Sequence, residues 1–324
     1  MNSEPRPPLS ICILSWNTRD LLQACLHSIF EDPQSQEWEV VVVDNNSSDQ
    51  SPAMVTAAFP QVRLVVNSSN LGFAAGNNRA METARGDHLL LLNSDTRVEP
   101  GALGRMADFL RANPDVGAVG PKLLSADGSL QLSCGIRPSL LSEFVNKMLL
   151  HNLFPFYKLG RWHHRETRDV DWVMGACLLV RRKVVEEVGG LDPAIFMYHE
   201  DLDWCLRIRD RGWRISYFPD SCIHHLRGAS TRQNLRNMLV VSQRSLYFLF
   251  AKHFGRGPVL TLRLLTLIEM TLRSLVWLPY SILSSRRREE GHQRLLAYRD
   301  IFWKSLLDRE YWLPTGSTLD SRSN

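Results

Sequence analysis

The chain has 324 residues, a formal net charge of +4, 44% hydrophobic residues and 22% charged residues. This composition is typical of a folded globular protein and excludes extensive disorder away from the ends. The small net charge gives no support for nucleic-acid binding, which needs basic residues concentrated on one surface.

Between Leu9 and Leu92, short apolar runs alternate with segments long enough for helices. The runs are rich in Val, Ile and Leu, which is typical of strands buried on both faces of a sheet. The predicted strands are 9–14, 38–43, 62–66 and 88–92, and the predicted helices are 20–30, 50–59 and 73–84. This alternation predicts βαβ units and a parallel sheet between layers of helices.

A second set of elements follows, with strands at 171–180 and 213–218 and helices at 181–188 and 201–209. After about Ser230 the chain consists of long Leu- and Arg-rich stretches with few strand signals. We therefore expect an α/β domain at 9–231, a helical C-terminal region at 232–314 and a polar tail at 315–324, which we expect to fray.

The start of the chain, Met1 to Pro8, lacks the basic and apolar blocks of a secretion signal. The six cysteines lie far apart, with no CxxC pair, and several have apolar neighbours. This spacing argues against a zinc site or a disulfide framework and favours a reducing compartment. The expected location is the cytoplasm.

Polar residues follow each of the first four predicted strands. They form the segments Ser15-Trp16-Asn17, 44–49, 70–78 and Asn93-Ser94-Asp95. In an open α/β sheet, ligands bind at the carboxyl ends of the strands, so these segments predict a binding edge. Turn formation and helix capping explain any single segment equally well, but they explain all four together less well.

Two of these segments allow a more specific interpretation. The 72–78 segment matches neither GxGxxG nor GxxxxGK[ST], which disfavours a Rossmann dinucleotide site or a P-loop. Asp95 directly follows a buried strand, where a carboxylate can bind Mg²⁺ together with substrate phosphates. The alternative for Asp95 is the capping of a turn.

Three carboxylates, Glu200, Asp201 and Asp203, lie at the start of a predicted helix, where the helix dipole favours negative charge. Asp203 can pair with Arg207 at i,i+4. Asp201 has no obvious local partner, so it is a candidate general base toward a hydroxyl group.

The pair His224-His225 follows later in the chain. Such a pair is more often structural than ligating. A His that joined Asp95 on a cation would favour Mn²⁺ over Mg²⁺.

In this order, the motifs resemble those of family 2 glycosyltransferases with the GT-A fold, an α/β fold with a Rossmann-like mixed sheet, and most closely their bacterial rhamnosyltransferase-like branch. The resemblance implies that Asn17 and Asp44 hold the nucleoside of a nucleotide diphosphate sugar, and that Asn70 and Asn78 contact this donor. Asn93-Ser94-Asp95 resembles the DxD motif with Asn93 in the first acidic position, which implies a loosely held Mg²⁺ or Mn²⁺ on Asp95.

The resemblance also assigns the acceptor side of the site. Gly175 and Ala176, with Asp203, would line the sugar and acceptor site, and Glu200-Asp201 resembles the ED motif whose Asp is the catalytic base. His225, within HxxGxS, matches the metal-binding His, and His224 is the alternative.

The reaction implied by the resemblance is a single inverting displacement, with the cation stabilising the departing nucleoside diphosphate. The expected acceptor is a hydroxyl of a glycan or lipid-linked glycan, in cell-surface polysaccharide biosynthesis. Rhamnose from a dTDP donor is the first guess, and it rests on family likeness alone.

Two other functions compete with this interpretation. A sugar nucleotidyltransferase would carry a Gly-rich basic loop after the first strand, where this chain has Ser15-Trp16-Asn17-Thr18. A catalytically silent binding subunit would not need Asp44, Asp95, Asp201 and His225 together.

The C-terminal region raises the question of membrane association. Between Gly257 and Ser285 the only charges are Arg263, Glu269 and Arg273, and a basic run, 286–288, follows. The charge-free stretch 274–285 is shorter than the about 20 residues that span a bilayer, and Pro279 within it is expected to kink or end a helix. Attachment to an anionic membrane surface and packing on the catalytic domain or a partner are equally good alternatives, ahead of a membrane span.

Overall fold

The computed structural model describes residues 6–148, 150, 162–226, 234–283 and 287–313. The chain divides into two compact units. The sheet unit comprises Met1–Arg137, Trp162–Pro193 and Glu200–Ser230, and the helical unit comprises the remaining residues. Two stretches inside the predicted 9–231 domain, Pro138–Arg161 and Ala194–His199, therefore cluster with the helical unit.

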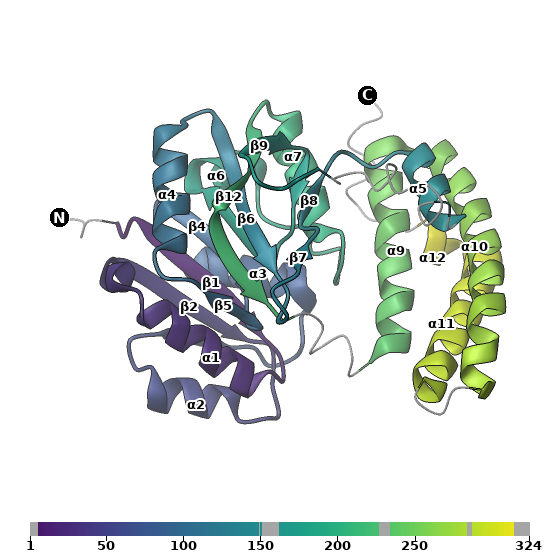
Figure 1. Cartoon of the computed structure of the whole chain (residues 1–324), viewed down its shortest axis with the longest axis horizontal. Helices are drawn as coiled ribbons and strands as arrows, with labels where there is room; N and C mark the ends of the chain where they lie inside the picture. Colours follow the sequence, from purple (N-terminus) through teal and green to yellow (C-terminus); the bar gives the residue numbers. More distant parts are fainter. Residues whose placement is uncertain (1–5, 149, 151–161, 227–233, 284–286, 314–324) are drawn as a thin grey trace. The chain divides into compact units, whose positions relative to one another are not determined.

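The sheet unit is built on a mixed sheet with the strand order β3-β2-β1-β4-β11-β6-β12-β5 (Figure 1). Strands β1, β2, β3 and β4 form parallel pairs with one another, as predicted. In contrast, β11 is antiparallel to both β4 and β6. The strands of this path are β1 (Leu9–Ser15), β2 (Trp38–Asp44), β3 (Arg63–Val66), β4 (His88–Asn93), β5 (Thr96–Val98), β6 (Val116–Leu124), β11 (Cys177–Arg181) and β12 (Arg214–His225).

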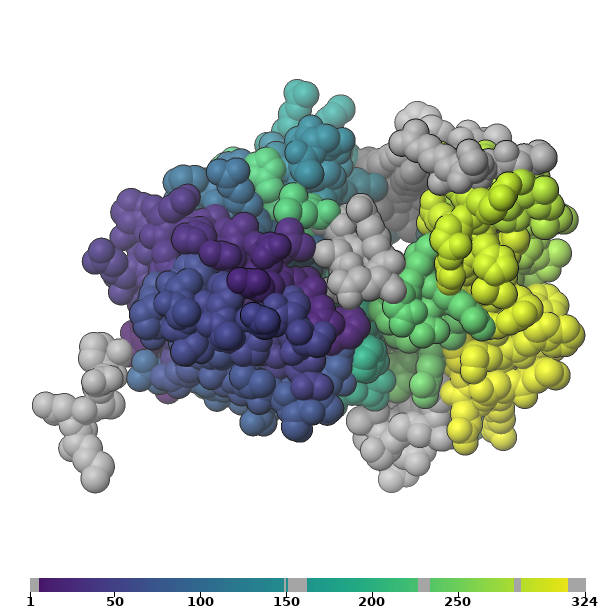
Figure 2. Space-filling model, turned by 90° about the horizontal axis from the view of Figure 1, so that it is seen from below, coloured from purple at the N-terminus to yellow at the C-terminus, as the bar shows by residue number. Residues whose placement is uncertain are grey.

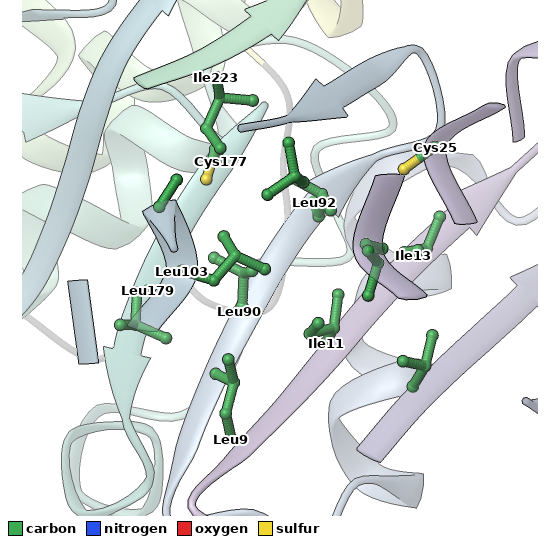
Figure 3. Packing of buried hydrophobic residues seen from close by; sticks show 14 of the residues in the cluster. Leu9, Ile11, Ile13, Cys25, Leu90, Leu92, Leu103, Cys177, Leu179 and Ile223 are labelled. Atoms are coloured by element: carbon green, nitrogen blue, oxygen red, sulfur yellow. The ribbon is translucent and has the colours of Figure 1, made fainter. Parts of the chain in front are cut away.

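Helices cover both faces of this sheet. Because side chains alternate along a strand, Ile11 and Ile13 of β1 face one layer and Cys12 faces the other. The first layer contains α1 (Arg19–Phe30), α2 (Ser51–Ala58) and α4 (Ala102–Ala112), and the second contains α3 (Gly72–Thr83), α6 (Arg182–Val188) and α7 (Glu200–Asp210). Figure 3 shows the first layer's core, in which Leu90 lies between Ile11 and Leu179, as the strand order β1-β4-β11 requires.

The prediction of one continuous strand at 171–180 is wrong. It divides into β10 (Trp172–Val173), which pairs with β8 (Cys134–Gly135), and β11, with residues 174–176 between them. The reason is that the intervening N–H groups bond outside a ladder: Met174 donates to the Ser133 carbonyl and Gly175 to the Asp201 carboxylate.

The predicted strand at 213–218 is too short, because β12 continues to His225. Its register shifts between Phe218 and Cys222, and beyond this irregularity it pairs with both β6 and β5. Short strands complete the unit, namely β7 (Leu130–Gln131), which pairs with β6, and β9 (Arg168–Val170), which pairs with β12.

The helical unit consists of α5 (Leu140–Lys147), α9 (Leu235–Phe254), α10 (Arg256–Leu283), α11 (Arg288–Leu307) and α12 (Arg309–Trp312). In its interior Lys147 Nζ lies 2.7 Å from Glu269 Oε2 and donates to Gln243 Oε1 at 3.1 Å. Of the two alternatives predicted for Pro279, a kink or the end of a helix, the second is wrong, because α10 continues to Leu283. This proline lies close to the C-terminal end of the helix, where the loss of one N–H donor interrupts little of the remaining hydrogen-bond ladder.

One face of α10 is apolar and exposed. Its residues follow one another at intervals of three, four or seven, which places them on one side of a helix. They are between 41% and 64% exposed and comprise Leu260, Leu264, Ile268, Leu275, Leu278 and Ile282. We call this set the α10 stripe.

None of the described helices combines the length and the apolar character that a bilayer crossing requires. Figure 2 shows one face of the molecule, where the yellow surface belongs to the helical unit and the purple surface to the start of the sheet unit. Arg286 and the predicted tail 315–324 lie outside the described residues.

Candidate active site

Hydrogen bonds join the carboxyl ends of the first, second and fourth strands. After β1, the Thr18 hydroxyl lies 2.9 Å from that of Ser94, which follows β4. Asn17 bonds to the loop after β2: its N–H donates to Ser47 Oγ at 3.0 Å, and its Oδ1 accepts the N–H of Ser48 at 2.8 Å. Asn17 therefore fixes the shape of the edge where the sequence predicts a nucleoside.

Asp44 lies at the end of β2 and is 1% exposed. Its Oδ2 accepts the N–H of Ser47 at 2.8 Å, whereas its Oδ1 is buried without a hydrogen-bond partner among the described residues. A buried polar atom without a partner costs stability. An N–H or O–H group of a ligand at this oxygen would remove that cost, which suits the predicted nucleoside contact.

Asn70 holds the loop that leads into α3. Its Oδ1 accepts from Asn45 Nδ2 and from the N–H of Gly72, each at 2.9 Å. Asn45 completes the network, because its Oδ1 accepts the N–H of Leu71 at 3.0 Å. The predicted contact of Asn70 with the donor stays a prediction.

The side-chain amide of Asn78, on α3, makes two hydrogen bonds to the backbone of Leu191. Its Nδ2 donates to the Leu191 carbonyl at 2.7 Å, and its Oδ1 accepts the Leu191 N–H at 2.8 Å. The side chain thus clamps the backbone ahead of α7. This gives Asn78 a structural task that the sequence did not indicate, and its donor contact stays a prediction.

His225 and Asp95 lie side by side because β12 pairs with β5 in the register His225↔Thr96. The Nε2 atom of His225 is 3.3 Å from Asp95 Oδ1 and accepts from Asn93 Nδ2 at 3.3 Å. Successive residues of a strand face opposite sides, and His224 accordingly lies 3.2 Å from Glu99 instead. The structure therefore favours His225 over the alternative His224.

These donors fit a divalent cation. An imidazole nitrogen and a carboxylate oxygen are suitable ligands for Mn²⁺, and two adjacent ligands at about 2.1 Å from an octahedral ion lie about 3.0 Å apart. The described residues contain no group of three or more His, Cys, Asp or Glu side chains that could hold a metal. A cation here would therefore need oxygens from water or from a bound diphosphate.

Asp201 is held by two backbone N–H groups. Its Oδ2 accepts from Gly175 at 2.8 Å and its Oδ1 from Leu202 at 2.7 Å. Burial raises the pKa of Asp201 above its usual value, although these hydrogen bonds oppose the rise. Burial therefore outweighs the effect of the helix start, which by itself favours the ionised form.

Glu200 is buried, and its Oε2 has no hydrogen-bond partner among the described residues. Burial raises the pKa of Glu200 well above its usual value, and the neighbouring charge of Asp201 raises it further. Two adjacent carboxyl groups thus differ in environment, and Asp201 alone is stabilised by two backbone donors.

Asp203 was predicted as a substrate residue from the family resemblance, and this role stays a prediction. The Asp203 side chain is 0% exposed and lies 2.8 Å from Arg207 Nε, in the i,i+4 pair that was the alternative. The ion pair with Arg207 gives Asp203 a structural role inside the sheet unit.

A chain of contacts connects Asp201, the candidate base, to the candidate metal ligands. Asp201 binds the N–H of Gly175, the carbonyl of the next residue, Ala176, accepts the N–H of Asn93 at 3.0 Å, and Asn93 contacts His225. The predicted residues from four separate segments therefore converge at one end of β4.

Gln131 also belongs to this group, although no sequence pattern predicted it. Its side chain bonds to both the ring and the carbonyl of His225. A single Gln between Leu130 and Leu132 matches no motif, so only the fold reveals the contact.

The mixed sheet, with donor-side loops after parallel strands and a reversed strand beside β4, defines a GT-A nucleotide-sugar transferase fold, as predicted. A mannosyltransferase from Pyrobaculum calidifontis, solved in complex with GDP-Man and Mn²⁺, is similar with a TM-score of 0.55 at 19% identity, over 94% of this chain and 89% of that one. S. aureus TarS is similar with a TM-score of 0.51 at 15% identity, over 93% of this chain and 81% of that one.

The chain belongs to the family described as Glycosyl transferase family 2, whose pattern matches residues 10–189. It is 32% identical over 272 residues to the N-acetylglucosaminyl-diphospho-decaprenol L-rhamnosyltransferase of Mycobacterium tuberculosis, covering 77% of this chain and 86% of that protein. The family resemblance seen in the sequence is thereby confirmed. The protein is a glycosyltransferase, which sets aside the nucleotidyltransferase and silent-subunit alternatives.

Proposed function

We propose that the protein is a metal-dependent inverting glycosyltransferase that moves a sugar from a nucleoside diphosphate to an acceptor hydroxyl. The observation that carries the proposal is the chain of contacts from Asp201 through Gly175, Ala176 and Asn93 to His225. It supports a single site in which a base and a cation-binding pair act on the same substrate.

Asp201 is the proposed base. With one backbone N–H on each oxygen, its carboxylate keeps lone pairs free to accept the proton of the acceptor hydroxyl. A pKa raised by burial makes the carboxylate a stronger base while the two N–H groups hold its orientation. Glu200, whose raised pKa favours the neutral form, is a poor competitor for this role.

On the donor side, Asp44 would bind the nucleoside through its unpartnered Oδ1, with Asn17 and Asn70 holding the loops around it. Asp95 and His225, with Asn93 beside them, would hold Mg²⁺ or Mn²⁺ against the diphosphate. The cation, when bound, would stabilise the negative charge that develops on the leaving group.

We propose L-rhamnose from a dTDP donor as the transferred sugar and a lipid-linked glycan as the acceptor. The support is the M. tuberculosis relative, whose name gives both an L-rhamnosyl donor group and a diphospho-decaprenol acceptor. The P. calidifontis mannosyltransferase is too distant, at 19% identity, to bear on the choice of sugar.

The test is a panel of nucleotide sugars with Mn²⁺ or Mg²⁺, measuring release of the nucleoside diphosphate with and without a polyprenyl-diphosphate glycan. We expect turnover with dTDP-L-rhamnose and its loss on chelation of the metal. Turnover with another donor alone would overturn the choice of sugar, and full turnover with chelator would overturn the metal dependence.

We also propose that the α10 stripe attaches the protein to an anionic membrane surface, where a lipid-linked acceptor would be found. The stripe offers an exposed apolar face, and Arg287 and Arg288 are exposed just beyond the C-terminal end of α10. This combination is typical of helices that lie in a membrane interface.

Sedimentation with liposomes containing anionic lipid tests this proposal. The variant Leu264→Glu/Leu275→Glu, which places charges on the stripe, should reduce binding relative to the wild type. Equal binding of the two proteins, or binding of neither, would exclude the stripe as the contact.

A further inference from the structure

The side chain of Gln131 contacts both the ring atom Nδ1 and the backbone carbonyl of His225. Gln131 Nε2 lies 2.6 Å from the carbonyl oxygen of His225, and Gln131 Oε1 lies 3.0 Å from His225 Nδ1. Only the NH₂ group of the glutamine can donate to a carbonyl oxygen. The first contact therefore fixes the orientation of the amide, with Oε1 toward the ring.

This orientation determines the tautomer of the imidazole. A carbonyl oxygen accepts but does not donate, so Nδ1 must carry the hydrogen. In the neutral ring the lone pair is then on Nε2, the atom 3.3 Å from Asp95 Oδ1. Asn93 Nδ2 can only donate, and its contact with Nε2 agrees with this assignment. Asp95 Oδ1, which only accepts when ionised, opposes it at the same distance unless a cation lies between the two atoms.

Pairing with the neighbouring strands sets the position of Gln131. It lies on β7, where Gln131 pairs with Leu123 of β6, and Leu123 also pairs with Ile223 of β12. The side chain is 4% exposed, so little water competes for its hydrogen bonds. Two residues further on, the Ser133 carbonyl accepts the N–H of Met174 at 2.7 Å, next to Gly175.

We propose that Gln131 is a positioning residue that holds His225 in the Nδ1–H tautomer and so presents the Nε2 lone pair to the divalent cation beside Asp95. The proposal rests on the proposed metal-binding role of His225, and it adds a residue that acts through His225 without touching the metal. Partners of this kind on ligating histidines typically change metal affinity about 10- to 100-fold when removed.

The first readout is the tautomer, which needs no metal. In full-length protein labelled with ¹⁵N-histidine, the His225 ring signals are identified by their loss in His225→Ala and assigned from long-range ¹H–¹⁵N correlations. We expect the Nδ1–H form in the wild type. Gln131→Met, which keeps the length but has no hydrogen-bonding amide, should show a shift toward the Nε2–H form.

The second readout is the affinity for Mn²⁺ alone, from electron paramagnetic resonance of the free ion. We expect Gln131→Met to weaken binding about 10- to 100-fold. Gln131→Glu keeps an acceptor for Nδ1–H and should retain both the tautomer and most of the affinity. Leu130→Ala, in the same strand but at a 41% exposed side chain, is the matched control and should match the wild type.

The proposal is overturned if folded Gln131→Met keeps both the Nδ1–H signals and the wild-type affinity. If Gln131→Met does not fold, Gln131→Glu decides, because an Nε2–H ring in that variant contradicts the proposal. If His225→Ala binds Mn²⁺ as well as the wild type does, His225 is not a ligand and the proposed metal site fails. The ring signals would even then report separately whether Gln131 sets the tautomer.

Discussion

The backbone N–H of Gly175 donates a 2.8 Å hydrogen bond to the carboxylate of Asp201. This contact joins the break between β10 and β11 to the start of α7. A Cβ at position 175 would lie 3.3 Å from Asp201 Cβ, so glycine allows the backbone to approach the carboxylate closely. Two consecutive residues thus connect the two sides of the site: Gly175 holds the proposed base, and the carbonyl of Ala176 accepts the N–H of Asn93.

Replacement of Asp201 by asparagine should abolish most of the transfer while leaving donor binding intact. The amide cannot accept the acceptor's proton, and loss of a general base costs about 10²- to 10⁴-fold in rate. Initial rates with saturating donor and acceptor give the first quantity, and calorimetric titration with the nucleoside diphosphate gives the second. Retained turnover would remove Asp201 from its proposed role.

The activity should also have an acidic limit set by Asp201. Burial raises the pKa of this carboxyl, so it becomes protonated, and unable to accept a proton, at a higher pH than an exposed aspartate would. We therefore expect kcat/KM to fall as the pH is lowered through that raised pKa. The measurement is a pH profile with Mn²⁺ kept saturating at each pH, and full activity down to pH about 4, the usual aspartate range, would contradict the prediction.

Glu200 should make the protein less stable as the pH rises. Its folded-state pKa is raised, so above the usual pKa of about 4.3 the unfolded chain has released a proton that the folded chain keeps. The stabilising effect of this proton is complete below the unfolded pKa and is lost as the pH increases through the folded pKa. Glu200→Gln, which stays neutral, should have a flatter dependence of unfolding free energy on pH in denaturant titrations. Parallel curves for the two proteins would show that Glu200 has an ordinary pKa.

The clamp formed by Asn78 gives a prediction that separates structure from donor binding. Asn78→Ala leaves the N–H and carbonyl of Leu191 without these partners, at a cost of about 1–3 kcal/mol in unfolding free energy. Asn78→Asp keeps only the acceptor and should lie between alanine and the wild type. If Asn78 acts only as a clamp, the affinity for the nucleoside diphosphate should be unchanged in folded Asn78→Ala. A weakened affinity would support the donor contact predicted from the sequence.

The sheet should depend strongly on its central strand. Leu90 of β4 is 0% exposed in the layer that contains α1 and α4, so Leu90→Ala should cost about 2–5 kcal/mol. Val66→Ala, on the edge strand β3 at a 55% exposed side chain, is the control and should change the stability by about 0.5 kcal/mol or less. Equal losses for the two variants would show that β4 is not the packing centre.

The sequence was most informative where elements are continuous and packed on both faces. The four predicted strands and three predicted helices from Leu9 to Asn93 match the structure within one residue at each end, because their apolar runs are unbroken. The reversed direction of β11 was not predicted, since strand direction depends on which partner the chain meets and not on local pattern.

The site was less predictable than the fold. Asp44, Asp95, Asp201 and His225 were identified because they stand in motifs, and their roles stay predictions. The i,i+4 spacing indicated the pairing of Asp203 with Arg207, but the complete burial of Asp203 could not be predicted from that spacing. The contact of Gln131 with His225 joins positions 94 residues apart, and no local signal encodes it.

Because β11 is reversed, the two sides of the site are carried by different parts of the chain. The strands that carry the donor-side loops, β1 to β4, are joined through local helices, whereas Gly175 and Asp201 reach the same point from later segments through β11 and α7. Changes of length in the connection between β6 and β11 need not disturb the parallel half. Under the proposed function, one half can thus keep its nucleotide while the other is remodelled for a new acceptor, which is a route by which a single scaffold diversifies its products.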